Sequence, residues 1–390
     1  MNSLIESSYP VIDAHCHPCP QPGPHSWADF CRSYSLTVPR PGQKPRAAKG
    51  IMEEHMLLQL ARLFRCEPDP DTVMAERGRR LGDPGDYTRL LMQDAGIGGM
   101  VVDFGYPQPP LSPAYWREMT GVQVAEIFRI EPLIQKLLGE CSDFASFRTR
   151  YLEGLAAALS RPDCAGLKSI IAYRTGLAVA ICGEDDARRS FARRVGVPQE
   201  LKPLRDWCLL QAMEMCQQYG KPMTIHTGAG DSEIKLDVAR PELLYDVLTT
   251  DPYHEVPVVL VHAGYPWCRQ AAFMVRVLDN VYLDTSLVSP YAGAGVRLFL
   301  EEILHLAPAE KVMHGSDGFA VPEVAWLGAI LTRRALAAFW SDMVDEGFVR
   351  AAFAQFALRS ILTDNARRVF RCSSHQVKSA AHSSPGKNGQ

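Results

Sequence analysis

The chain has 390 residues, of which 47% are apolar, and its formal net charge at pH 7 is −3. This length and apolar content suit one large barrel with insertions, and the small net charge gives no electrostatic basis for binding nucleic acid or an anionic membrane. No apolar run predicts a membrane span and the N-terminus lacks a signal-peptide pattern, so we expect a cytoplasmic protein whose eleven scattered Cys are free thiols.

The first predicted strand ends in two histidines. The apolar segment at residues 11–14 suits a buried strand, and His15 and His17 lie two residues apart, so their side chains project from one face. Pro18 has no N–H and stops the strand just after them. Two imidazoles that converge at a strand end suit a divalent metal, most often zinc. Taken alone, the pattern is also compatible with two ordinary polar residues at a strand end.

A long insertion separates this strand from the second one, which is predicted at Gly99–Phe104. The Pro- and Gly-rich residues 18–50 predict an irregular loop over the barrel mouth, and the apolar stripe in residues 51–80 predicts a helix. Because such excursions often carry function, we expect the insertion, at about residues 18–85, to form a mainly helical cap beside the active-site mouth.

The third strand is predicted at Val124–Glu131. Arg129 and Glu131 then share a face by the two-residue rule. Two interpretations stay open for this pair. The side chains contact substrate or metal at the barrel mouth, or they form an internal ion pair.

The fourth strand is predicted at Ala165–Arg174. Tyr173 and Arg174 lie near its mouth end, where they are well placed to meet an anionic or carbonyl-bearing substrate. Lys168 lies five residues before Tyr173, so we expect it to sit deeper in the barrel, too deep to reach a site at the strand ends. A lysine paired in the barrel interior is therefore an alternative to a functional one.

Polar residues also follow the apolar runs of later strands. These strands are predicted at Pro222–His226, Pro257–His262, Val281–Asp284 and Lys311–Asp317. His226, His262 and Asp317 stand at three of the strand ends. His314 faces the other way by alternation, so we do not expect it to be a ligand. Asp231 follows the fifth strand in a Gly-rich loop, where it contacts a substrate amine or caps a turn.

Eight strands that alternate with helices predict a parallel (β/α)8 barrel of the TIM type, in which active sites form at the C-terminal ends of the strands. The order His-x-His, His, His, Asp at successive strand ends is much more specific than any one of its parts. We expect residues 1–371 to form this single domain. Residues 372–390, which are polar and without an apolar pattern, are expected to be a disordered tail.

These residues make the chain similar to the amidohydrolase superfamily of metal-dependent hydrolases. More narrowly, the chain resembles the amidohydrolase-like domain that is fused to glutamine-synthetase-like domains in fungi and plants. We expect no glutamine-synthetase-like portion in this chain. The matching segments cover most of residues 10–370 and include VIDAHCHP, GLKSIIAYRTGL, PMTIHTGAGD, VVLVHAGYPW and MHGSDGFAVPE.

The resemblance implies a divalent metal site with one or two ions, Zn2+ or alternatively Mn2+. The implied ligands are His15, His17, His226, His262 and Asp317. Many superfamily members carry a strand-four lysine that carbon dioxide converts to a metal-bridging carbamate, which gives Lys168 a place in the ligand set. Asp317 is implied as the group that moves the proton, and His262 as a second-metal ligand or a group that polarises the scissile carbonyl.

The implied reaction is hydrolysis of the C–N bond of an amide by a metal-activated water, with γ-glutamyl-type amides among the candidate substrates. Decarboxylases and lactonases with the same ligand pattern are the alternatives. A catalytically silent binding barrel is disfavoured because all the polar strand ends are present. The expected partner is a small-molecule substrate, and we expect no binding to nucleic acid or to a membrane. Both a monomer and a homo-oligomer are compatible with the sequence.

Overall fold

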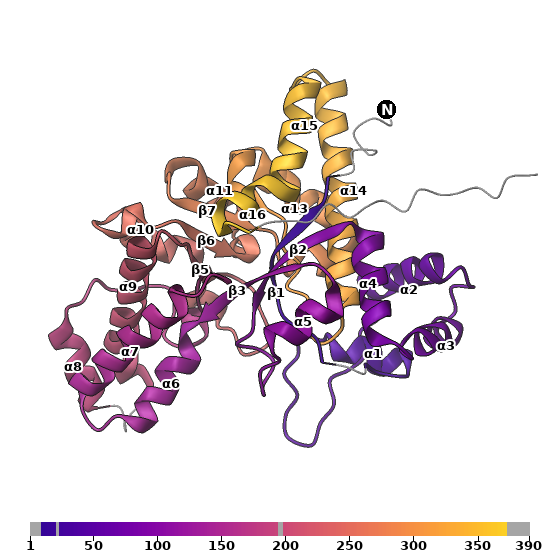
Figure 1. The fold of residues 1–390 in the computed structure, drawn as a ribbon. Helices are drawn as coiled ribbons and strands as arrows, with labels where there is room; N and C mark the ends of the chain where they lie inside the picture. The colour runs from indigo at the N-terminus through magenta and orange to yellow at the C-terminus, as the bar shows by residue number, and fades with distance from the viewer. Residues whose placement is uncertain (1–8, 21–22, 194–197, 373–390) are drawn as a thin grey trace, which may run out of the picture.

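The computed structural model describes residues 9–20, 23–193 and 198–372. Eight parallel strands follow one another around a barrel in the order β1 to β8 (Figure 1). Backbone hydrogen bonds from Ala14 N to His314 O (2.8 Å) and from Asp317 N to His15 O (2.8 Å) close the seam between the first and last strands. The predicted TIM-type barrel is therefore confirmed. The strands are β1 Val11–Cys16, β2 Ile97–Asp103, β3 Gln123–Arg129, β4 Cys164–Ser169, β5 Met223–His226, β6 Val258–Val261, β7 Val281–Asp284 and β8 Val312–Met313.

Helices surround the barrel, and short 3-10 turns join several of them. The insertion between β1 and β2 contains α1 Trp27–Ser33, α2 Ile51–Phe64 and α3 Pro70–Arg80. The other helices are α4 Pro84–Ala95, α5 Pro113–Thr120, α6 Ile130–Glu140, α7 Phe144–Leu159, α8 Glu184–Ala192, α9 Lys202–Tyr219, α10 Tyr245–Thr249, α11 Cys268–Val277, α12 Val288–Tyr291, α13 Val296–Leu304, α14 Glu323–Asp345, α15 Ala351–Arg359 and α16 Asn365–Phe370.

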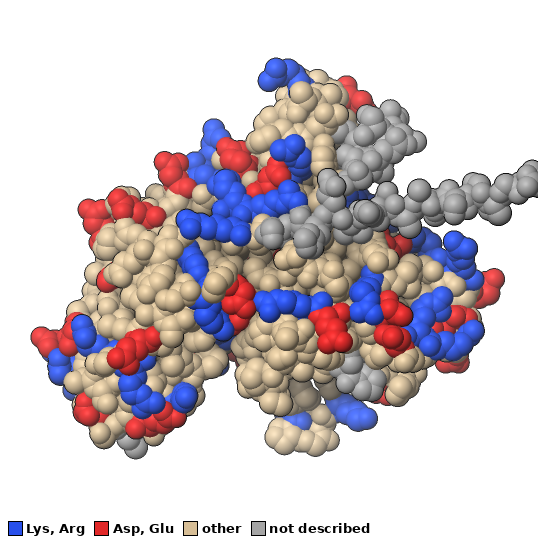
Figure 2. All heavy atoms as spheres, in the orientation of Figure 1, with Lys and Arg blue, Asp and Glu red and all other residues tan. Residues whose placement is uncertain are grey.

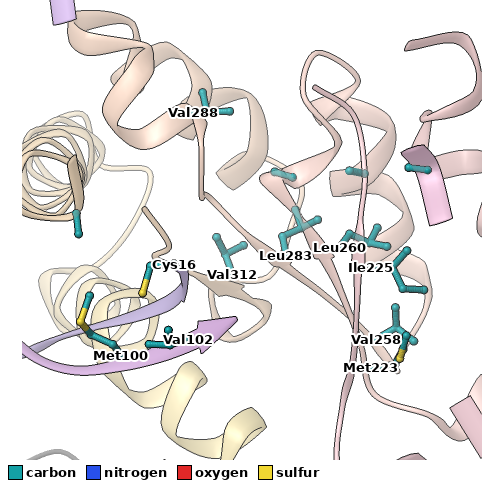
Figure 3. Packing of buried hydrophobic residues seen from close by; sticks show 14 of the residues in the cluster. Cys16, Met100, Val102, Met223, Ile225, Val258, Leu260, Leu283, Val288 and Val312 are labelled. Atoms are coloured by element: carbon teal, nitrogen blue, oxygen red, sulfur yellow. The ribbon is translucent and has the colours of Figure 1, made fainter. Parts of the chain in front are cut away.

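The core has two parts because each strand buries both faces. Figure 3 shows Met223 and Ile225 of β5 beside Val258 and Leu260 of β6, in the large cluster between strands and helices. Residues between these positions face the barrel interior, where Val259 and Met313 pack in a second cluster. This alternation places His226, which follows Ile225, on the interior face.

Two predicted strand ends are wrong, and they share one cause. The chain leaves β3 at Arg129 and enters α6, so Glu131 lies in the first turn of a helix and not on the strand face of Arg129. The buried Glu131 carboxylate accepts hydrogen bonds from Ser169 Oγ (2.7 Å) and Ile170 N (2.8 Å). These bonds take Ile170 out of the ladder, so β4 ends at Ser169 and a 3-10 turn carries Tyr173.

Other boundaries differ for local reasons. The helix predicted across residues 51–80 divides at Arg65, whose left-handed φ of 57° ends α2. Strand β8 ends at Met313, because the next backbone N–H, that of His314, donates to Ile361 O (3.0 Å) outside the sheet. Asp317, with a φ of 55°, lies in the left-handed region and cannot belong to an extended strand. The loop predicted at residues 18–50 includes the short helix α1. From residue 373 onward, the predicted tail lies outside the described residues.

A buried ion pair fixes the insertion to the barrel. Arg77 of α3 donates from Nε to Glu323 Oε1 at the start of α14 (2.5 Å), and from Nη1 to Pro24 O (2.8 Å). The Tyr87 hydroxyl donates to the same carboxylate (2.8 Å). The insertion is thus connected to the segment that directly follows the Asp317 loop.

Charged side chains of both signs share the face seen in Figure 2, where many blue spheres touch red ones. Side chains of opposite charge also form ion pairs, of which Arg117–Asp163 (2.9 Å) is one. None of the eleven Cys, all of which lie in the described residues, forms a disulfide with another. Among the described residues, no helix has the length and apolar content needed to cross a membrane.

Candidate metal centre

The C-terminal ends of four strands bring the predicted ligands together. His15 and His17 come from β1 and the residue just after it, and Asp317 comes from the loop after β8. Asp317 Oδ1 lies 3.3 Å from His15 Nε2 and 3.4 Å from His17 Nε2. Asp317 Oδ2 lies 3.9 Å from Nε2 of His262, which follows β6. The carboxylate therefore stands between imidazoles from two sides of the barrel.

His226 completes the cluster from β5. Its Nδ1 lies 3.2 Å from His262 Nε2, and its buried Nε2 has no hydrogen-bond partner among the described residues. Potential ligand atoms of His15, His262 and Asp317 all lie within 4.8 Å of one another. His17 and His226 border this group through Asp317 and His262.

Hydrogen bonds on the far side of two imidazoles set which nitrogen faces the cluster. His17 donates from Nδ1 to the Asp103 carbonyl (2.9 Å), so in the neutral ring the lone pair is on Nε2. Ser286 Oγ donates to Asp284 Oδ1, and therefore accepts from His262 Nδ1 (2.8 Å). Both Nε2 lone pairs thus point toward the Asp317 carboxylate. Acceptors that face one another in a buried site fit a cation held between them.

The pKa shifts of the cluster residues also fit a bound cation. Burial, followed by the charge of Lys168, lowers the pKa of His15 to about 4. Burial also lowers the pKa of His262, and it holds that of His226 well below the usual range. Burial raises the pKa of Asp317, but the surrounding histidines outweigh it and hold that pKa well below its ordinary value. Neutral imidazoles beside an ionised carboxylate are the donor set that a divalent transition metal prefers, so the residues fit such an ion.

Lys168 reaches the cluster, and the expectation that it sits too deep is wrong. Its Nζ lies 2.7 Å from His15 Nε2, and its side chain is 1% exposed. Because β4 ends at Ser169, Lys168 is the next-to-last residue of the strand, and Tyr173 belongs to the turn beyond it. Burial lowers the pKa of Lys168.

Several residues that support the cluster were missed in the sequence. Asp284 accepts hydrogen bonds on Oδ1 from the backbone N–H groups of His262 (3.1 Å) and Ser286 (2.9 Å). Asp13 accepts from Ser316 N (2.9 Å) and from His15 N (3.2 Å). The sequence does indicate these two residues, because each is a carboxylate inside an apolar segment, VIDAH or VYLDTS. A buried charge is costly unless it has a specific partner.

A cavity of about 600 Å3 opens over the cluster. Of the predicted substrate-binding residues, four line it: Arg129, Tyr173, Arg174 and Asp231. Arg129 is held by Asp103 Oδ2, which accepts from its Nη2 (2.6 Å) and Nε (2.9 Å). The Tyr173 hydroxyl accepts a hydrogen bond from Asp231 N (3.1 Å). Glu131 does not line the cavity.

The insertion covers one side of the cavity mouth. Leu36 O accepts a hydrogen bond from Ser232 N (2.9 Å), and Val38 N donates to Ser232 Oγ (2.9 Å). These bonds fix the segment after α1, part of the indigo loop at the bottom of Figure 1, beside the loop that follows β5. The segment also contributes Leu36, Val38 and Pro39 to the lining of the cavity.

Comparisons with known proteins place the barrel among its relatives. Residues 183–372 match the family model described as Amidohydrolase. Protein fluG of Emericella nidulans is 29% identical over 420 aligned residues, which include 98% of this chain and 48% of that protein. The chain therefore spans about half the length of this curated relative.

Solved structures show the same fold. A protein from Lactobacillus casei, solved as a candidate metal-dependent hydrolase, superposes with a TM-score of 0.84 at 22% identity, covering 95% of this chain and 97% of its own. The uronate isomerase of Thermotoga maritima superposes with a TM-score of 0.69 at 13% identity, covering 95% and 96%. At these identities, the likeness describes the barrel and not the reaction.

Proposed function

We propose that this chain is a member of the amidohydrolase superfamily, whose family model matches residues 183–372, and that it is a metal-dependent hydrolase that cleaves the C–N bond of a small amide. The main support is the cluster of four imidazoles around Asp317 at the C-terminal end of the barrel. A divalent ion bound there, Zn2+ or Mn2+, would supply a Lewis acid and lower the pKa of a water toward ~7.

The protein side chains have distinct roles in this proposal. His15, His17, His226 and His262 would hold the ion through ring nitrogens, and Asp317 would be an oxygen ligand. Because its pKa is held low, Asp317 is ionised at neutral pH and accepts the proton of the attacking water. Asp317 then passes this proton to the leaving nitrogen, because an amine leaves far more readily than an amide anion.

Substrate recognition is proposed for residues around the cavity. Arg129, fixed by Asp103, and Arg174 at the mouth suit a substrate carboxylate. Asp231 suits an ammonium group, and its backbone bond to Tyr173 fixes its loop. A γ-glutamyl-type amide carries both charges. We assign Glu131 to the fold, because its Oε1 accepts bonds from Ser169 and Ile170.

The experiment that tests the function compares metal and substrate together. Protein stripped with a chelator and reloaded with Zn2+ or Mn2+ is assayed on γ-glutamyl amides, N-acyl amino acids, lactones and small aromatic carboxylates. We expect metal-dependent release of amine from an amide. Turnover of lactones alone indicates the lactonase alternative, and release of carbon dioxide indicates the decarboxylase. Absence of bound metal and of any stimulation by metal indicates a silent binding barrel.

A separate prediction concerns Lys168. Its Nζ reaches the cluster, and burial lowers its pKa, which increases the neutral amine that carbon dioxide requires. We expect metal loading to improve with added bicarbonate, and isotope-labelled bicarbonate to give a carbamate signal by NMR. Lys168→Gln should lose the signal. The control Lys221→Gln should keep it, because Lys221 Nζ donates to the carbonyls of Leu159 and Arg161. An identical spectrum for wild type and Lys168→Gln means that Lys168 is not carboxylated.

A further inference from the structure

The cavity has two walls of different chemistry. The end of β3 and the segments after β4 and β5 supply a charged wall with Arg129, Arg174 and Asp231. The loops after β2 and β8, on the adjoining arc of the barrel, supply Tyr106 and Phe319. Both walls line the same cavity as His17, His226, His262 and Asp317 of the metal cluster.

The aromatic side chains form a chain of ring contacts that begins at the cluster. His17 and Tyr106 meet edge to face, with ring centroids 5.5 Å apart, and Tyr106 and Phe319 meet in the same way at 6.1 Å. Tyr106 is nevertheless 44% exposed, because its free surface faces the cavity. A large exposed ring beside a predicted metal ligand presents apolar surface that a bound molecule can bury.

The insertion extends this apolar surface across the mouth. Leu36, Val38 and Pro39 line the same cavity, and the bonds to Ser232 hold their backbone in place. Val38 is 41% exposed. We call Tyr106, Phe319, Leu36, Val38 and Pro39 the apolar wall. It is contributed by three segments that are far apart in the sequence.

We propose that the apolar wall is a substrate subsite, and that the substrate is a small anionic amide that also carries a hydrophobic substituent. The inference rests on the proposed amide hydrolysis for its reaction, but the subsite can be tested by binding alone. The continuity of the wall with the metal cluster supports a substrate as its occupant. A hydrophobic group that enters from the cluster side removes this surface from water, while the arginines hold the anionic end.

The test uses two probes with the same anionic acyl part, the monomethylamide and the monobenzylamide of glutaric acid. Binding to metal-loaded Asp317→Asn protein is measured by calorimetry, so that turnover does not interfere. We expect the benzylamide to bind about ten- to a hundredfold more tightly, the scale for burying one aromatic ring. Phe319→Ala should remove most of this preference. Val38→Ser, at an exposed loop position away from the metal ligands, should lower it about threefold or more.

The matched control is Leu298→Ser, since Leu298 of α13 is 67% exposed and does not line the cavity. It should keep the full preference for the benzylamide. Equal affinity for the two probes, no binding of either, or a preference unchanged in both Val38→Ser and Phe319→Ala overturns the subsite. Tight benzylamide binding without hydrolysis by the wild-type protein overturns the amide reaction and leaves the subsite standing.

Discussion

His15→Ala and His17→Ala should each lose most of the bound metal and the activity, while the barrel stays folded. Each variant removes a ring nitrogen that lies within 3.4 Å of Asp317 Oδ1 and leaves the carboxylate in place. Metal affinity should fall more than about 100-fold, because even the partners that orient a ligand are worth about 10–100-fold. Elemental analysis after dialysis against a weak chelator measures the loss, and circular dichroism checks the fold.

His254→Ala is the matched control for this experiment. His254 is a half-exposed histidine whose Nδ1 pairs with Asp251 Oδ1 at 2.9 Å, and it is not part of the cluster. Its loss should change neither metal content nor turnover. If His15→Ala and His17→Ala bind as much metal as this control and remain fully active, the ion is held elsewhere.

The ligand cluster could be predicted from the sequence because a parallel barrel brings all its C-terminal strand ends to one edge. Each polar residue at the end of an apolar run was thus a candidate for the same site. His15, His226 and Asp317 are separated by long stretches of chain, and the contacts of the structure bring them into one group.

Glu131 and Lys168 show where this reasoning fails. Both errors come from strand ends placed too late, and those ends are set by hydrogen bonds between the Glu131 carboxylate and residues 169–170. A hydrogen bond between segments almost forty residues apart cannot be predicted from the local sequence of either segment. Tyr106 and Phe319 were missed for a related reason, because single aromatic residues in loops have no periodicity that shows which cavity they face.

Asp317→Asn should reduce turnover by roughly two to four orders of magnitude, the usual scale of general acid–base catalysis. The substitution keeps the shape of the side chain, and Asn tolerates the left-handed backbone of this position, where φ is 55°. The amide cannot accept a proton from water, whereas the Asp317 carboxylate, with its pKa held low, can. Turnover is measured on metal-loaded protein with metal content determined in the same sample.

The metal content of Asp317→Asn should fall much less than that of His15→Ala, because four imidazoles and an amide oxygen remain. Glu233→Gln is the matched control, since Glu233 also lines the cavity but is exposed at its rim, and its turnover should stay within about twofold. A large loss of turnover with little loss of metal in Asp317→Asn, and no loss of turnover in Glu233→Gln, would assign the effect to proton transfer. It would exclude weaker metal binding and a change in the charge of the cavity as causes. If Asp317→Asn keeps near-normal turnover on an authentic substrate, another group must transfer the proton. His262, whose Nε2 lies 3.9 Å from Asp317 Oδ2, is then the next candidate.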